Sequence, residues 1–326
     1  MAWDRFLDQD KIISILRSYI ELDQVSGSFI FSGLKGVGKF SIAKEFSKSV
    51  NCLQSAGDSC SVCQNCVQIE REFHPDFYIV RPAEKSGEIT IDMIRELQRF
   101  LNLSPANARK KFFIIDQAEK MNIESANAFL KSLEEPPLDS VIILVSSRPG
   151  ALIATIKSRC KELKFRPLSK KTIGILLRDK FELTIEESAR ISALSEGGLD
   201  FDLEGIDLTG IETTLKEFFR FPRFKERGDK NLLHQQRERL KDKIRILILY
   251  IRDILCIVNE VDSLSVFPSL DNRDKVINIE SKDLIEKIDK LEYLYSALGS
   301  NVNPDFIYKV VRNLYKEVEL KSEIHS

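Results

Sequence analysis

The sequence contains no hydrophobic run long enough to cross a membrane. Its most apolar stretch, at 246–251, is far shorter than the roughly 18 residues that a membrane-spanning helix needs. The segment 1–8 is charged and lacks the apolar core of a signal peptide. We therefore expect no membrane partner and take the cytoplasm as the default location.

An excess of charge of one sign is also missing. The 326 residues include 49 Lys and Arg and 50 Asp and Glu, so the net charge is close to zero. No whole-chain field draws the protein to nucleic acid or anionic lipid, and any DNA-binding surface must be local. Basic runs at 109–111 and 223–239 are candidates for phosphate contacts. Acidic neighbours in the second run favour an ordinary solvated surface instead.

The pattern of the expected elements changes near residue 166. Up to that point, strand-like apolar segments alternate with segments of helical spacing, which predicts a doubly wound parallel α/β sheet. Beyond it the periodicity is helical, most clearly over 240–258. A chain of this length suggests two or three domains. We expect an α/β domain over 1–166, a small helical domain over 167–207 and an all-α domain over 208–326.

One stretch, at 32–41, has the spacing of a phosphate-binding P-loop. It follows an apolar strand-like segment and leads into a helical one. Gly33, Gly36 and Gly38 would let successive backbone N–H groups wrap phosphate oxygens, and Lys39 would add a full charge at a helix N-terminus. The alternative is a glycine-rich turn without a ligand.

The hydroxyl that should complete this loop is absent. The pattern requires Ser or Thr after the lysine to ligate Mg²⁺, but Phe40 stands there, and Ser41 lies one helical step, about 100°, away. Asp116 closes an apolar run and is the candidate for an acidic Mg²⁺ ligand, or else a strand-end carboxylate that caps a turn. Gln117 follows it and cannot act as a general base. The site is therefore suited to hold phosphate but poorly equipped for hydrolysis.

Cysteine is sparse outside one cluster. Of six cysteines, Cys52, Cys60, Cys63 and Cys66 lie together in a module at 52–66, and no histidine lies among them. In a large chain without a secretion signal, such a cluster favours metal over disulfides. Four thiolates form a closed tetrahedral shell for a structural Zn²⁺. Free thiols and an iron–sulfur cluster are the alternatives.

Arg159 lies in the short string Ser158-Arg159-Cys160, and by itself it is most simply a solvated surface charge. Several other motifs occur with it: the degenerate P-loop, the cysteine module directly after its helix, and the strings at 74–76, 114–121 and 126–137. Together these motifs resemble the bacterial clamp-loader family, the AAA+ subunits of the DNA polymerase III holoenzyme. The resemblance covers about residues 1–205, and the string at 126–137 is highly specific for the family.

The resemblance implies an AAA+ domain with an inserted zinc module, a helical lid and a helical collar for oligomerisation. In this family the gamma/tau subunits are ATPases with intact motifs, whereas delta prime members commonly have impaired ones. This chain departs from the ATPase pattern at Phe40, at Gln117 and at Asp200, which stands where the family's sensor 2 arginine is expected. Arg159 is intact, and the family carries this arginine to a neighbouring subunit as a trans finger on bound ATP.

By this resemblance the chain is a delta prime-type member that does not itself hydrolyse ATP, within a DNA polymerase holoenzyme. It would close the loader ring beside gamma/tau and delta subunits and help place the sliding clamp on primed DNA in the bacterial cytoplasm. Two alternatives stay open. One is an active gamma/tau-type ATPase, which would need a hydroxyl at 40 and a glutamate at 117. The other is a zinc-bearing DNA-binding module, against which the near-zero net charge argues.

Overall fold

The computed structural model describes residues 2–83, 86–181, 230–259, 280–298 and 302–323, with individual positions between 184 and 199. The chain divides into two compact units, residues 1–173 with 196–200 and residues 174–195 with 201–326. The boundary at 173 falls within helix α7 (Lys170–Phe181). The domain limits expected at 166 and 207 stay predictions, and the second lies outside the described residues.

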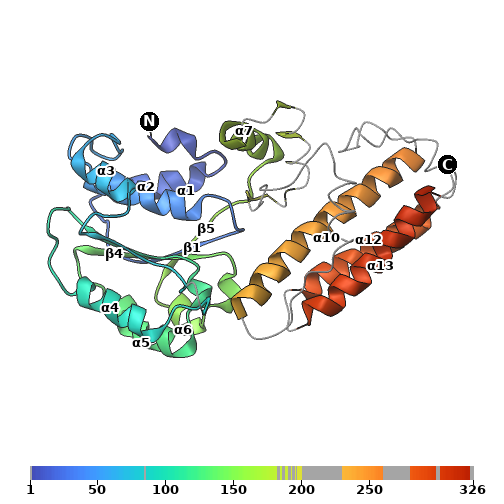
Figure 1. Cartoon of the computed structure of the whole chain (residues 1–326). Helices are drawn as coiled ribbons and strands as arrows, with labels where there is room; N and C mark the ends of the chain where they lie inside the picture. The colour runs from blue at the N-terminus through green and yellow to red at the C-terminus, as the bar shows by residue number, and fades with distance from the viewer. Residues whose placement is uncertain are drawn as a thin grey trace. The chain divides into compact units, whose positions relative to one another are not determined.

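A five-stranded parallel sheet forms the centre of the first unit (Figure 1). Its strand order is β2-β3-β4-β1-β5, and every neighbouring pair is parallel. The strands are β1 (Gly27–Ser32), β2 (Phe77–Val80), β3 (Lys111–Ile115), β4 (Ser140–Ser146) and β5 (Lys161–Lys164). β3 and β4 are buried along their whole length, as continuous apolar runs predict for strands covered on both faces. The parallel sheet expected from the sequence is confirmed.

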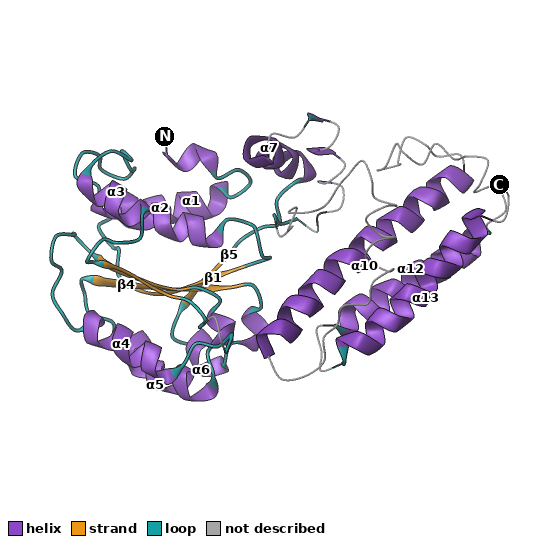
Figure 2. Cartoon of the chain, in the orientation of Figure 1, coloured by secondary structure: helices purple, strands orange, loops and turns teal. Residues whose placement is uncertain are grey.

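Helices cover both faces of this sheet (Figure 2). One face carries α1 (Asp10–Glu21), α2 (Lys39–Asn51) and α3 (Gln64–Glu70). The other carries α4 (Ile91–Leu101), α5 (Ile123–Glu134) and α6 (Ala154–Lys157). Short 3-10 turns occur at η1 (Ala2–Arg5), η2 (Ala118–Lys120) and η3 (Pro149–Ala151). Helices therefore cover both faces of the sheet, so a binding site on this unit is expected in the loops at the ends of the strands.

The core under α4, α5 and α6 follows from helical spacing of apolar residues. Ile94 and Leu97 of α4 and Phe129 of α5 pack on Phe113 and Leu144 of the sheet, each at most 1% exposed. The side chain of Asn122 caps the start of α5 by accepting a hydrogen bond from the amide of Ser125 at 2.8 Å. The helix ends at Glu134, before two prolines that cannot continue it.

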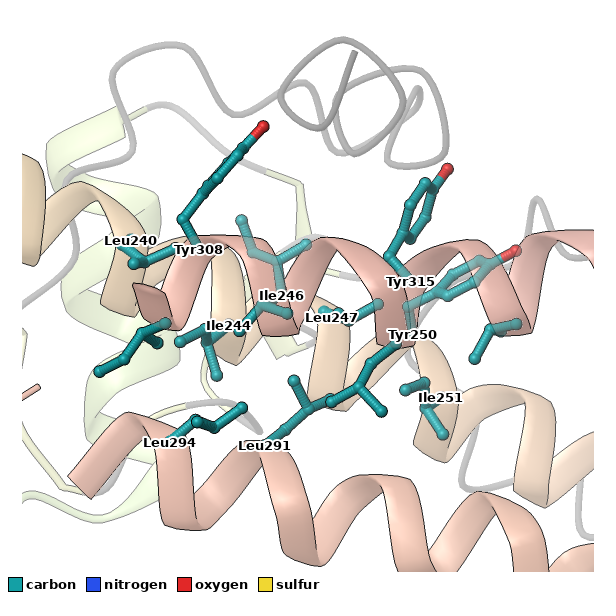
Figure 3. Packing of buried hydrophobic residues seen from close by; sticks show 14 of the residues in the cluster. Leu240, Ile244, Ile246, Leu247, Tyr250, Ile251, Leu291, Leu294, Tyr308 and Tyr315 are labelled. Carbon is teal, nitrogen blue, oxygen red and sulfur yellow. The ribbon is translucent and has the colours of Figure 1, made fainter. Parts of the chain in front are cut away.

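The second unit is helical in its described part. Its helices α10 (Lys230–Val258), α12 (Ser281–Ala297) and α13 (Pro304–Glu323) share one apolar core (Figure 3). Leu240, Ile244, Leu247 and Ile251, spaced three or four residues apart along α10, are all 0% exposed. The helical periodicity expected over 240–258 is confirmed. Across all described residues, every helix is too short or too polar to span a membrane.

Candidate functional site

The glycine-rich loop joins β1 to α2 at the carboxyl ends of the strands. Gly33, Gly36 and Gly38 have φ angles of +150°, +78° and +89°, a region that L side chains rarely adopt. Gly38 is the N-cap of α2, which begins at Lys39. The order of strand, loop and helix expected around these glycines is present, and their conformation explains why glycine is needed here.

Lys39 is bonded within its own loop. Its ammonium group donates a hydrogen bond of 2.7 Å to the carbonyl oxygen of Gly33 and another to that of Leu34. A third, of 3.2 Å, reaches the hydroxyl of Ser147, just beyond β4. The side chain is 5% exposed. Its charge therefore stabilises the loop carbonyls and the end of a neighbouring strand.

A second backbone segment packs against the tip of this loop. The amide of Leu199 donates a 3.1 Å hydrogen bond to the carbonyl oxygen of Gly36. A Cβ on Gly36 would clash with the backbone of Leu199, and one on Gly198 would clash with the carbonyl oxygen of Lys35. Both positions therefore require glycine. The neighbouring Asp200, expected at the sensor 2 position, lies outside the described residues.

Phe40 occupies the position at which the P-loop pattern has a metal-binding hydroxyl, and its ring forms part of a cation–π cluster. The guanidinium of Arg81 lies 5.1 Å and the ammonium of Lys44 5.6 Å from the centre of its ring. Arg81 donates two hydrogen bonds, of 3.0 and 2.9 Å, to the carboxylate of Glu72. Lys44 pairs with the same carboxylate at 3.0 Å. The ring is thus fixed by charged partners, and it offers no oxygen ligand.

Asp116 follows β3 at the same edge of the sheet as the loop. Burial raises the pKa of its carboxyl and nearby Glu119 adds to this, while the charges of Arg81 and Lys39 oppose it. Gln117 is exposed, has a left-handed φ of 52°, and donates its amide N–H to Asp116 at 3.0 Å. The edge therefore carries an acid that could face a phosphate-bound cation, but no general base follows it.

The four clustered cysteines converge in space. Their Sγ atoms all lie within 4.8 Å of one another. Cys52 caps the carboxyl end of α2, Cys63 caps the start of α3, and Cys66 lies within α3. A tetrahedral Zn²⁺ with Zn–S bonds of about 2.3 Å would separate the sulfurs by roughly 3.8 Å. This donor set therefore fits a closed tetrahedral metal site after small adjustments.

Backbone amides tune one of these thiols. N–H groups of Val62 and Cys63 face the sulfur of Cys60 and lower its pKa to about 6, and the Cys63 bond is 3.2 Å long. The lowered pKa favours the thiolate form of Cys60, which is the form that binds metal. Burial raises the pKa of Cys66, whose proton a metal ion would displace.

The cysteine module is tied to the start of the chain by contacts that sequence spacing did not suggest. The indole N–H of Trp3 donates to the carbonyl oxygen of Gly57 at 3.3 Å, and the amide of Ala2 donates to Asp58 at 3.2 Å. Trp3 is 1% exposed. These partners are more than fifty positions apart, and only the folded chain brings them together.

Arg159 follows α6 and is held by three groups of its own chain. Its Nε lies 3.2 Å from a carboxylate oxygen of Glu134, at the end of α5. Its Nη1 donates to the carbonyl oxygen of Thr155 at 3.1 Å and to the hydroxyl of Ser158 at 3.4 Å. The side chain is 30% exposed. This arginine therefore has a defined position at the surface.

Arg159 and the glycine-rich loop lie at opposite ends of the strands. Lys161, two residues after Arg159, pairs with Phe29 near the start of β1, whereas the loop follows the end of β1. At about 3.3 Å per residue, the strand places the two roughly 20 Å apart. Arg159 is thus remote from the phosphate-binding loop of its own chain.

The His-Pro-Asp string organises a loop. The carboxylate of Asp76 accepts hydrogen bonds of 2.8 to 3.0 Å from the amides of Ala106, Asn107 and Ala108. Burial opposes ionisation, but these amides hold the pKa of Asp76 below its usual value. His74 is 3% exposed, and burial lowers its pKa. Both residues therefore have structural roles.

The basic run at 109–111 is engaged inside the chain. Arg109 pairs with Asp23 at 2.7 Å, and Lys110 lies 3.3 Å from Asp139. Lys111 is 3% exposed and donates to the carbonyl oxygen of Leu103 at 3.0 Å. Most side chains of the second run, at 223–239, lie outside the described residues. The first run is therefore a poor candidate for phosphate contacts.

A parallel sheet with a glycine-rich loop after β1 and an acid after β3 defines a P-loop-type α/β protein. Residues 8–169 match the model of a family described as DNA polymerase III, delta subunit. The chain belongs to the bacterial DNA polymerase III clamp-loader family.

Two relatives from Bacillus subtilis (strain 168) illustrate the match. The DNA polymerase III subunit delta' is 38% identical over 165 residues, which are 51% of this chain and 50% of the relative. The DNA polymerase III subunit tau is 31% identical over 205 residues, 61% of this chain and 36% of the relative. The chain thus spans half or less of the length of these relatives.

A solved structure also aligns along most of the chain. It is that of a DNA polymerase III gamma subunit-related protein from Thermotoga maritima, with a TM-score of 0.41 and 21% sequence identity. The alignment covers 94% of this chain and 98% of that one.

Proposed function

We propose that this chain is a delta prime-type subunit of the bacterial clamp loader. It closes the loader ring, does not hydrolyse ATP itself, and supplies Arg159 to the ATP site of an adjacent gamma/tau subunit. The observation that carries this proposal is the position of Arg159, ordered at the surface and remote from the loop of its own chain. From there it cannot reach its own loop, so the nucleotide that we assign to it is one held by a neighbour.

Two departures from the ATPase pattern support a loss of hydrolysis. Phe40 replaces the hydroxyl that would bind Mg²⁺ and is fixed by Arg81. Gln117 follows the acid at the end of β3 and cannot take a proton from water. Each departure removes a different part of the phosphoryl-transfer machinery.

The partners follow from the same proposal. Relatives named delta' and gamma/tau are similar to this chain, so gamma/tau and delta subunits are the expected neighbours in the ring. The sliding clamp and primed DNA are the substrates of the assembled loader, in the bacterial cytoplasm. Zn²⁺ held by Cys52, Cys60, Cys63 and Cys66 is the structural cofactor. The expected lid and collar domains, over 167–207 and 208–326, complete the chain.

The test replaces Arg159 in a reconstituted loader. Arg159→Ala is assembled with gamma/tau, delta, clamp and primed DNA, and DNA-stimulated ATP turnover is measured. We expect turnover to fall at least about tenfold, because the finger offsets charge that develops on the neighbour's ATP. Arg95→Ala, at an arginine that is 62% exposed in α4, is the matched control and should leave turnover unchanged. Unchanged turnover in Arg159→Ala would refute the proposed role.

A separate measurement addresses the active-ATPase alternative. The isolated chain is incubated with Mg²⁺ and ATP, and phosphate release is followed. We expect none above background. Sustained hydrolysis that Lys39→Ala abolishes would assign the chain to the gamma/tau type instead. Tight, steeply salt-dependent DNA binding by the isolated chain would favour the DNA-binding module.

A further inference from the structure

The guanidinium of Arg159 has a held side, Nε and Nη1, which is hydrogen-bonded within the chain, and a presented side, Nη2. Nε and Nη1 are bonded to Glu134, Thr155 and Ser158. Nη2 has no partner among the residues that the structure describes. A guanidinium is planar, so fixing two of its nitrogens also fixes the direction of the third. The held side therefore determines where Nη2 can meet a ligand.

Of the three groups that hold Arg159, only Glu134 is charged and comes from another helix. Thr155 and Ser158 lie within four residues of the arginine and follow it if the chain moves. Glu134 is 25 residues away, at the end of α5. It therefore anchors the guanidinium to the part of the fold that packs on the sheet.

Glu134 stands at a place that is locally unfavourable for an acid. It is the last residue of α5, where the helix dipole favours cations. Its carboxylate is 59% exposed, and its bond to Arg159 is its only ion pair within the described chain. Helix stability therefore does not account for the residue, whereas the bond to Arg159 does.

We propose that Glu134 is the positioning residue for Arg159, a role that rests on the trans function proposed for that arginine. By accepting the Nε–H bond, its carboxylate keeps the long side chain in one rotamer and so fixes the direction in which Nη2 is offered to the neighbour. Without it, the arginine keeps its charge but samples directions in which Nη2 misses the neighbour's phosphates. The bond affects the rate of the chemical step and not the affinity of the neighbour for ATP.

The test compares two neighbouring glutamates in the reconstituted loader. Glu134→Gln removes the charge that holds Arg159, and Glu135→Gln removes the adjacent exposed charge, which makes no described ion pair. We expect Glu134→Gln to lower kcat for DNA-stimulated ATP turnover about fivefold, with KM for ATP changed less than twofold. Glu135→Gln should match the wild-type protein. Glu134→Asp, which retains the carboxylate, should recover part of kcat.

Arg159→Ala, measured in parallel, distinguishes two kinds of failure. If Arg159→Ala lowers kcat but Glu134→Gln does not, the positioning role is wrong and the finger remains. A higher kcat in Glu134→Gln would make the bond a restraint and would also overturn the positioning role, as would equal losses in both glutamine variants. If Arg159→Ala has no effect, the trans function itself fails. Matching thermal unfolding curves verify that each variant is folded.

Discussion

The ammonium group of Lys39 lies 2.7 Å from the carbonyl oxygen of Gly33, within the same loop. In a loop that binds nucleotide, this lysine would direct its charge toward the β- and γ-phosphates. Here the loop carbonyls and Ser147 accept its hydrogen bonds. These hydrogen bonds of Lys39 stabilise the fold by themselves, so replacing the lysine should lower the stability of the protein.

We predict that Lys39→Met lowers the free energy of unfolding by about 1–2 kcal/mol, because hydrogen bonds from a buried charged donor are lost. Urea denaturation followed by circular dichroism measures the change. Lys131→Met, at an exposed position of α5, is the control and should shift stability by less than about 0.5 kcal/mol. Equal stability of Lys39→Met and the wild-type protein would show that the lysine has no structural role.

The cysteine cluster predicts about one zinc per chain, measurable by elemental analysis. Trp3 is the only tryptophan, and it is buried against Gly57, which lies between Cys52 and Cys60 in the sequence. Chelation should loosen this turn and expose the indole, so tryptophan emission should move to longer wavelength as zinc leaves. Because the metal binds the folded state, its loss should also lower the melting temperature.

Two cysteine variants test this reporter. Cys66→Ser removes a ligand and should reproduce the shifted emission without chelator. Cys160→Ser is the control, since Cys160 lies outside the cluster and burial raises the pKa of its thiol to about 12. A preparation that contains iron, or one whose emission is indifferent to chelator, would contradict the zinc assignment.

Asp76 predicts a pH-dependent contribution to stability. Despite burial, three backbone amides hold its pKa below the unfolded value of about 3.9. Its stabilising effect is therefore fully present above about pH 4 and is lost as pH falls through the lower, folded pKa. We expect Asp76→Asn to lower the free energy of unfolding by about 2–3 kcal/mol at pH 7. This difference from the wild-type protein should shrink in acid.

Urea denaturation at pH 7 and in the acidic range, down to about pH 3, measures the effect of Asp76→Asn. Asp92→Asn provides a matched control, because Asp92 is 84% exposed and forms only a surface pair with Arg95 at 3.5 Å. It should change stability little at either pH. A difference for Asp76→Asn that stays constant across this range would mean that the charge of Asp76 is not what stabilises the loop.

Local patterns made much of the fold predictable from the sequence. The parallel sheet follows from apolar runs such as 112–115, and the periodicity of α10 follows from Leu240, Ile244 and Leu247. The turn around Gly38 and the convergence of the cysteines follow from spacing over a few residues. In these cases neighbours in sequence remain neighbours in space, so a period or a spacing carries the information.

Contacts between distant segments could not be predicted in this way. The bond between Trp3 and Gly57, the pair of Arg159 with Glu134, and the amides that face Asp76 join residues 25 to 54 positions apart. Nothing in the local sequence selects these partners, because helix packing decides which side chains meet. The cation–π contact between Arg81 and Phe40 is of the same kind. The sequence shows that Phe40 stands in place of a hydroxyl residue, but it does not show that Arg81 packs over the ring.

The helical part of the chain gives a last prediction. Leu247 is 0% exposed in the core that α10 shares with α12 and α13 (Figure 3). Leu247→Ala should lower the free energy of unfolding by about 2–5 kcal/mol, through lost burial and the cavity left behind. Ile285→Ala, at a position of α12 that is 48% exposed, should cost less than about 1 kcal/mol. Similar small losses in both variants would mean that the three helices do not form one packed core. If these helices serve as the oligomerisation collar, Leu247→Ala should also weaken co-purification with gamma/tau and delta subunits. Ile285→Ala leaves the core intact, so weaker co-purification in that variant would indicate a lost surface contact and not a loss of core packing.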